Sequence, residues 1–249
     1  MNPIILVYTE GLFRPLLNLL VGTTNIIPAH SVGWAIIVVT FIVRLILLPS
    51  SLHQVKRASQ QQTKMAAVQG RLKHIKEQHK DDKAKQAEET MRLYRESGIN
   101  PAAGCLPLLV QLPILIALYR VFLAGLTPEI QSMLYSFVPF PGDIHNLFFG
   151  INLTQPSLVL GILAGVAQFA QMKFLAPTPP QMTADDDAAA VTNSMQKNMA
   201  YIFPAMTVFI SLRLPAALAL YWFVTTVFGA AQQYLLRRWY HVSGNVPMV

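Results

Sequence analysis

The sequence contains few charged residues. Only 12% of its 249 residues are Asp, Glu, Lys or Arg, whereas roughly 25% would be usual in a soluble domain. Apolar residues make up 53%, and the mean hydropathy is +0.41. This composition excludes an ordinary soluble domain and predicts a single all-α, polytopic membrane protein.

The residues that most catalytic and metal sites need are also scarce. The single Cys105 excludes an intrachain disulfide and supplies no metal cluster. All six histidines lie outside the centres of the apolar segments, and the G-x-S-x-G pattern of a hydrolase is absent. We therefore expect no enzyme activity, no cofactor and no metal.

Acidic residues are absent from every apolar segment, so no carboxylate in these segments can pair with Arg44. Arg44 lies within the apolar run 33–52, ten residues after Trp34, which places it about 15 Å along a helix. An arginine at the centre of a membrane helix costs about 2.5 to 3.5 kcal/mol. Without a carboxylate at its own depth, it must be solvated by water, by amides and hydroxyls or by lipid phosphate. The sequence thus predicts a polar cavity, with a purely structural arginine as the alternative.

Apolar segments and charged stretches divide the chain into regions. Residues 1–30 are predicted to form an external interfacial helix and linker, because Arg14 and Asn18 share one stripe of an otherwise apolar helix; a short membrane span is the alternative. Residues 31–52 form the first transmembrane helix. Residues 98–236 contain the other four, at about 102–125, 157–176, 197–212 and 215–236, and 237–249 form a short tail.

The charged region 53–97 is predicted to be an antiparallel helical hairpin. Its two halves each carry a thin apolar stripe with steps of three and four, and a turn is expected at 79–82. The stripes are Met65, Val68, Leu72 and Ile75 in the first half and Ala84, Ala87, Met91 and Tyr94 in the second. Each is too thin to fold alone, so we expect the halves to bury their stripes against each other.

The distribution of basic residues predicts the orientation. The segment 52–101 holds 11 Lys and Arg residues, and 126–156 holds none. By the positive-inside rule the hairpin and the C-terminus are cytoplasmic and the N-terminus is outside. No aromatic residue is interleaved with the basic ones before Tyr94, so a specific nucleic-acid partner is not expected.

Several ordered motifs resemble the YidC membrane insertases and their mitochondrial and chloroplast relatives. The resemblance covers about residues 34–238. The motifs are TFIVRLILLP at 40–49, LYRESGINPAAGCLPLLVQLPILIALY at 93–119, MQKNMAYIFP at 195–204, LPAALALYWF at 214–223 and QQYLL at 232–236. The second motif is long and specific.

The resemblance implies five spans around a hydrophilic groove that is open to the cytoplasm and the lipid and closed to the outside. The groove would receive polar parts of nascent membrane proteins in the bacterial plasma membrane. Its expected residues are Arg44, Thr40, Gln111, Gln168, Tyr221 and Trp222, with Thr226 as a further candidate. Ordinary packing or hydrogen bonding between helices is the alternative role for each of these residues, and for Arg44 the alternative is the purely structural role given above. The Sec translocase, the ribosome and targeting factors are candidate partners.

The sequence departs from the family pattern in three ways. Ala217 stands where the family often has glycine, so packing at the start of the last span is expected to differ. No large external domain follows the first segment, and the tail has no long basic extension, so we expect no strong ribosome tether. A carrier or channel for small anions remains the alternative function, because it too could use Arg44.

Overall fold

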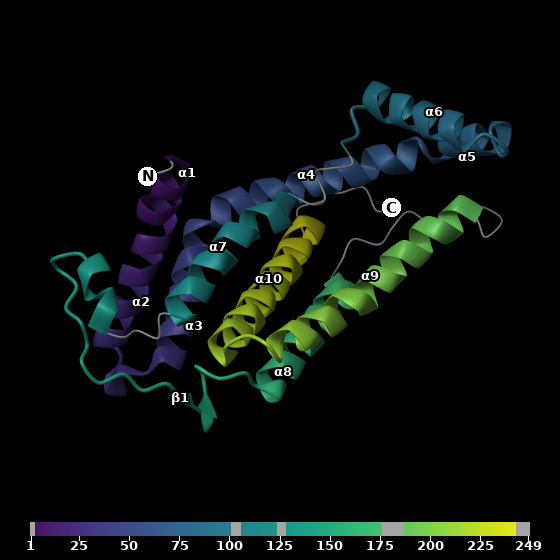
Figure 1. The fold of residues 1–249 in the computed structure, drawn as a ribbon. Helices are drawn as coiled ribbons and strands as arrows, with labels where there is room; N and C mark the ends of the chain where they lie inside the picture. Colours follow the sequence, from purple (N-terminus) through teal and green to yellow (C-terminus); the bar gives the residue numbers. More distant parts are fainter. Residues whose placement is uncertain (1–2, 101–105, 124–127, 176–186, 243–249) are drawn as a thin grey trace.

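The computed structural model describes residues 3–100, 106–123, 128–175 and 187–242 (Figure 1). Within them the chain is mostly helical, with little strand, which confirms the predicted all-α class at this level. The first half contains α1 (Pro3–Tyr8), a π-helical turn (Thr9–Phe13), α2 (Arg14–Ile26), a 3-10 turn (Pro28–His30), α3 (Val32–Ile46), α4 (Leu48–Ala67), α5 (Gln69–Gln78) and α6 (Lys83–Glu96). Cys105, most of the predicted loop at 177–187 and the end of the tail lie outside the described residues.

The second half of the chain adds four longer helical segments and one small ribbon. They are α7 (Leu106–Leu123), a 3-10 helix (Pro128–Met133), β1 (Leu147–Phe148), β2 (Ile151–Asn152), α8 (Leu158–Ala170) with a π-helical extension (Gln171–Leu175), α9 (Asp187–Ser211) and α10 (Ala216–Val242). β1 and β2 are antiparallel, with Leu147 opposite Asn152 and Phe148 opposite Ile151.

The N-terminal segment is helical from Pro3 to Ile26 and packs against α3 and α7. Its apolar face supplies Leu17, Leu20 and Val21 to the core, each fully buried. The predicted polar stripe lies against the protein's own loop. Asn18 is only 4% exposed, and its Nδ2 donates to the carbonyls of Arg14 (2.8 Å) and Met133 (3.1 Å). A buried amide needs such partners, so Asn18 fastens the loop after α7 to α2.

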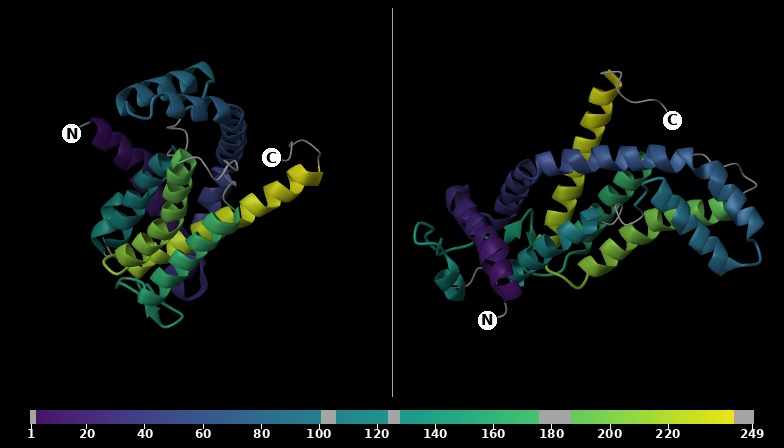
Figure 2. Two further views of the ribbon diagram at one scale, coloured as in Figure 1. Left: turned by 90° about the vertical axis from the view of Figure 1, so that its right-hand side faces the viewer. Right: turned by 90° about the horizontal axis from the view of Figure 1, so that it is seen from above.

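The first predicted span is bent. α3 ends at Ile46, and α4 continues after Leu47 at an angle of 60° to it. Pro49 lies in the first turn of α4, where a missing backbone N–H costs no hydrogen bond of that helix. The straight part is 15 residues long, which is about 22 Å at the helical rise. The helical path then leaves the bundle along α4 (Figure 2).

By length and composition, one helical stretch among the described residues can cross a membrane alone. It is Ile5–Ile26, in the region predicted to be interfacial. The bent pair α3 and α4 passes the same test when its parts are taken together, and shorter apolar helical stretches cover Gln111–Phe122, Leu158–Phe174 and Ala200–Ser211. The count of five spans and the interfacial placement of residues 1–30 stay predictions.

α5 and α6 pack against each other at the far end of α4 (Figure 1). The buried residues of this unit are Val68, Leu72, Leu93 and Ile99. The turn falls between Gln78 and Lys83, as predicted, and the Asp82 side chain accepts a hydrogen bond of 3.0 Å from the backbone N–H of Lys85. Burial raises the pKa of the Tyr94 phenol above its ordinary value.

The predicted stripe is right for the first half of the hairpin, whereas in the second half only Tyr94 of the stripe packs against the buried cluster. Met65 and Ile75 pack around the buried Val68 and Leu72. In α6, however, Ala84, Ala87 and Met91 are exposed, and the row that faces inward is Gln86, Thr90 and Leu93. Because this row contains a single large apolar residue, its periodic signal is weaker than that of the two alanines and the methionine on the outer face.

α10 lies between the other long helices and contacts α3, α7 and α8 (Figure 1). Its first turn is held by the segment after β2: the backbone N–H of Ala216 donates to Gln155 O (2.8 Å), and that of Ala217 to Leu153 O (2.9 Å). The first N–H groups of a helix have no partner within it, so these carbonyls fix where α10 begins. Ala217 is 2% exposed, with its side chain accommodated in the core.

α8 and α9 make close backbone contact through two glycines. A Cβ at Gly161 would lie 2.9 Å from Ser211 Cβ, and one at Gly165 would lie 2.6 Å from Val208 Cγ2 and 3.1 Å from Pro204 O. Glycines four residues apart lie on one face of a helix, where they let a second backbone approach. This spacing was present in the sequence but was not used in predicting the packing.

Candidate functional site

Arg44 is held by a hydroxyl group on α10. Its Nε donates to Thr225 Oγ1 at 2.7 Å. Arg44 is half-buried near the end of α3, and Thr225 is buried, with 6% of its surface exposed. The described salt bridges lie elsewhere: they pair Arg14 with Glu10, Arg71 with Glu96, and Arg92 with Glu89 and Glu96. Within the described residues the arginine is therefore positioned without being neutralised by a carboxylate.

One helical turn before Thr225, Tyr221 makes the next polar contact. Gln111 Nε2 on α7 donates to the Tyr221 hydroxyl at 2.5 Å. Tyr221 is buried and Gln111 half-buried. Residues four apart on a helix share one face, so Tyr221 and Thr225 point the same polar face toward α7 and α3. The bonds from Arg44 to Thr225 and from Gln111 to Tyr221 thus join α3 and α7 to the same face of α10.

Tyr221, Thr225 and Gln232 form a row of polar side chains along α10, which we call the polar row. Its third contact is made with α4. Gln232 Nε2 on α10 donates to Ser51 Oγ on α4 at 2.6 Å. Gln232 lies seven residues after Thr225, and Ser51 lies seven residues after Arg44. The contacts Arg44–Thr225 and Ser51–Gln232 therefore follow in the same order along α10 and along the α3–α4 path, so these two segments run parallel here. From Tyr221 to Gln232 the polar row spans 11 residues, about 16 Å of helix.

Gln168 belongs to a different contact. Its Oε1 accepts a hydrogen bond of 2.5 Å from Thr207 Oγ1, which links α8 to α9. The pair lies just beyond the close approach at Gly165, and Thr207 is only 1% exposed. Trp222 is half-buried on α10, beside Tyr221 in sequence. Neither Gln168 nor Trp222 shares a described hydrogen bond with the row that contains Arg44.

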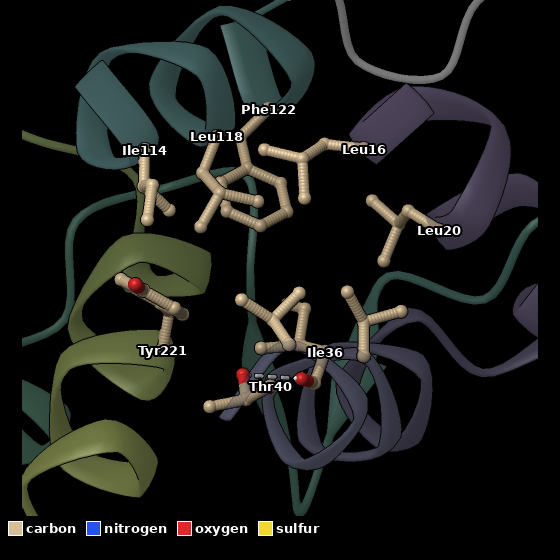
Figure 3. Close-up of a pocket in the computed structure, with 10 residues that line it drawn as sticks. Leu16, Leu20, Ile36, Thr40, Ile114, Leu118, Phe122 and Tyr221 are labelled. Atoms are coloured by element: carbon tan, nitrogen blue, oxygen red, sulfur yellow. Dashed lines mark hydrogen bonds between the residues drawn. The ribbon is translucent and has the colours of Figure 1, made fainter. Parts of the chain in front are cut away.

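Thr40 faces an apolar cavity between α2, α3, α7 and α10 (Figure 3). The cavity volume is about 10 Å³, which is room for about one water molecule at most. Eight of its lining residues are apolar, and Thr40 and Tyr221 are the two with hydroxyls. The Thr40 hydroxyl already donates to Ile36 O at 2.6 Å. This cavity is therefore a small packing defect in the core, distinct from the hydrophilic groove that the sequence predicts.

The sequence analysis missed the residue that accepts a hydrogen bond from Arg44. It named Thr226 as a candidate, whereas the hydroxyl that binds the arginine belongs to Thr225. Ser51, Thr207 and Gln232 were also missed. The spacing of Tyr221, Thr225 and Gln232, at steps of four and seven, was a usable signal, because such residues share one helical face. No group of three or more metal-ligating side chains occurs among the described residues.

Comparison with known proteins shows a match over most of the chain. Residues 23–243 match the family described as 60Kd inner membrane protein. The chain is 35% identical over 231 residues to a membrane protein insertase YidC of Fusobacterium nucleatum, covering 93% of this chain and 98% of that protein. It is 36% identical over 242 residues to the membrane protein insertase MisCB of Bacillus subtilis, covering 95% and 82%. A YidC of Chlorobium phaeovibrioides is 34% identical over 209 residues, but this chain spans only 33% of its length.

Proposed function

This chain belongs to the 60Kd inner membrane protein family, the family of the YidC insertases, and from that premise we propose that it inserts nascent membrane proteins into the bilayer along a path that contains Arg44. The path would run from the cytoplasm into the lipid. Its clients would be nascent membrane proteins, and the chain would act by lowering a barrier to crossing rather than by chemical catalysis.

The observation that carries this proposal is that Arg44 has no carboxylate partner among the described residues. Its described partner is the neutral hydroxyl of Thr225, which uses Nε. Both terminal nitrogens of the guanidinium are left without a described carboxylate. Because a guanidinium has five N–H donors, the group can keep its contact with Thr225 and still offer a fork to a carboxylate of a client.

The mechanism is electrostatic. A client with a short acidic outer segment must carry carboxylates partway across an apolar layer. Two opposite unit charges 4 Å apart attract by about 1 kcal/mol in water and by about 4 kcal/mol at an effective dielectric constant of 20. An arginine in a partly dry path therefore favours the carboxylate most strongly where the bilayer disfavours it. The polar row on α10 would supply neutral hydrogen-bonding groups along the same path.

The proposed topology places this path in the membrane. Five spans, formed by α3 and α7 to α10, would surround it, with the N-terminus outside and the C-terminus in the cytoplasm. The basic unit of α5 and α6, at the far end of α4, would stand at the cytoplasmic mouth, where a ribosome, targeting factors or the Sec translocase could meet it. The excess of Lys and Arg in residues 52–101 supports this orientation.

The test is a series of substitutions at position 44 in proteoliposomes. We expect insertion of a client with an acidic outer segment to decrease in the order Arg44, Arg44→Lys, Arg44→Ala, Arg44→Glu, because lysine keeps the charge and glutamate repels the client. Insertion is measured as protease protection of a radiolabelled single-span protein. A matched client with a neutral outer segment is the control, and it should depend much less on the series.

Two results would count against the proposal. If Arg44→Ala inserts both clients as well as the original protein, the arginine has no electrostatic role. If the protein moves small anions across liposomes but leaves the client unprotected, the chain is a carrier or channel. A structural role for the arginine is recognised separately, because it would make lysine nearly as damaging as alanine and would lower the melting temperature in detergent for both.

A further inference from the structure

The turn between β1 and β2 exposes apolar side chains in an unusual backbone conformation. Its two central residues, Phe149 and Gly150, have φ angles of 48° and 78°. Positive φ at both positions suits Asn-Gly, whereas a bulky residue there is strained. Phe149 is nonetheless 83% exposed, and Leu147 is 63% exposed. Neither the backbone of the turn nor contact with water favours phenylalanine at this position.

The turn is fixed firmly to the start of α3. The Phe148 side chain, 8% exposed, lies so close to Gly33 that a Cβ on the glycine would be 2.1 Å from Phe148 Cδ2. The backbone N–H of Val32 also donates to His145 O at 3.1 Å. The rings of Trp34 and Phe149 meet edge to face, with their centroids 6.3 Å apart. Docking on α3 therefore determines where Phe149 points.

Phe149 extends an exposed apolar stripe of α3. Trp34, Val38, Phe41 and Leu45 are 49%, 39%, 46% and 58% exposed, and their spacing of four, three and four residues places them on one face. Under the proposed topology α3 spans the membrane, and this exposed apolar face would then be in contact with lipid. Trp34 is the first residue of the stripe, so its contact with Phe149 joins the turn to the lipid-facing surface.

Charge does not oppose contact between the turn and lipid. From Ile144 to Met172 the sequence contains no Asp, Glu, Lys or Arg. Tryptophan and tyrosine are enriched at the boundary between hydrocarbon and headgroups, and Trp34, whose ring contacts Phe149, is such a residue. The apolar ring of Phe149 can be buried beside it without removing a charge from water. The turn thus combines an exposed ring, an uncharged surrounding and continuity with the lipid-facing stripe.

We propose that the β1–β2 turn is a membrane anchor, in which Phe149 and Leu147 insert into the lipid beside the first turn of α3. Under the proposed orientation this is the outer leaflet. Trp34 and Arg44 are ten residues apart, so anchoring this end of α3 places the arginine about 15 Å along the helix from the interface. The anchor would set the depth at which a client meets Arg44.

A nitroxide label at position 149 tests insertion directly. The label is attached to Phe149→Cys in a Cys105→Ala background and reconstituted into vesicles, with labels at Val38 and Asp143 as lipid and water references. Burying an apolar side chain of this size favours the inserted state by about tenfold to a hundredfold, so we expect collisions with a water-soluble nickel relaxer at position 149 to be about a tenth or less of those at position 143. Oxygen accessibility should approach that at position 38.

The outcomes separate lipid from the other possible surroundings. Nickel accessibility equal to that at Asp143 would show that the turn lies in water and would overturn the proposal. Low accessibility to both oxygen and nickel would show that protein covers the turn, which also overturns it. Neither measurement involves insertion of a client, so the result does not depend on the insertase mechanism proposed for Arg44.

Two substitutions at position 149 distinguish an anchor from a simple turn residue. Asparagine tolerates positive φ and suits the turn, whereas leucine keeps the apolar surface and does not. An anchor predicts that Phe149→Leu leaves the depth of a label at Val38 unchanged and that Phe149→Asn shifts it. An unchanged depth with asparagine, or a larger shift with leucine, would refute anchoring. The melting temperature of each variant in detergent shows whether the fold is retained.

Discussion

The hydrogen bond from Arg44 to Thr225 makes a quantitative prediction for Thr225→Val. Valine has nearly the shape of threonine and lacks the hydroxyl, so the substitution removes the 2.7 Å contact to Arg44 Nε with little change in packing. Hydrogen bonds to charged groups contribute about 1.5 to 3 kcal/mol. Arg44 is half-buried and can recruit water after the change, so we expect a loss near 1.5 kcal/mol, the lower end of that range.

This loss should be visible in both stability and activity. For a chain of this size, 1.5 kcal/mol corresponds to a decrease of about 3 to 6 °C in the melting temperature, measured in detergent by scanning fluorimetry. The arginine would also be less well positioned, so insertion of the client with an acidic outer segment should decrease more than insertion of the neutral one. Thr225→Ser keeps the hydroxyl and should retain most of both properties.

Thr226→Val is the matched control. Thr226 is also 6% exposed and adjacent in sequence, but it makes no described bond to Arg44. The decisive comparison is a double-mutant cycle, because in an Arg44→Ala background Thr225→Val has no guanidinium contact left to remove. The coupling between Arg44 and Thr225 is refuted if Thr225→Val lowers the stability as much in that background as in the original protein. It is also refuted if Thr225→Val lowers the stability no more than Thr226→Val does.

Two further predictions concern packing and topology. Gly165→Ala should destabilise the protein by about 1 to 3 kcal/mol, because its Cβ would overlap Val208 on α9; Gly22→Ala, where no atom lies within 4 Å of the new Cβ, is the control, and equal melting temperatures for the two would contradict the proposed close approach. A cysteine introduced at Asp143 should react with an impermeant thiol reagent from outside intact cells, whereas one at Lys80 should react only after permeabilisation, and the reverse pattern would invert the proposed orientation.

The family could be recognised from the sequence because its evidence is local. Scarcity of charge, the absence of carboxylates near Arg44 and the ordered motifs are all properties of short stretches, and family membership is shown by the comparisons. The helical class and the turn near residue 80 follow from apolar runs and turn residues in the same way. Where the local signal was weak, as in the inward row of α6 with its single Leu93, the prediction was wrong for Ala84, Ala87 and Met91.

The tertiary structure alone decided which polar groups meet. The spacing of Tyr221, Thr225 and Gln232 indicates that they share one face of α10, but it does not say which face meets Arg44. The rotation of α10 about its axis brings Thr225, and not Thr226, to Arg44, 181 residues away in the chain. That rotation depends on contacts along the helix, which include the carbonyls of Leu153 and Gln155 at its first turn and the bond from Gln232 to Ser51. Asn18 is a second example. The sequence predicts it on the polar stripe of an interfacial helix, whereas in the structure it is buried against the loop after α7. Composition and periodicity determine that a helix forms and which residues share a face, whereas the partner of each face depends on the summed packing of segments far apart in the chain.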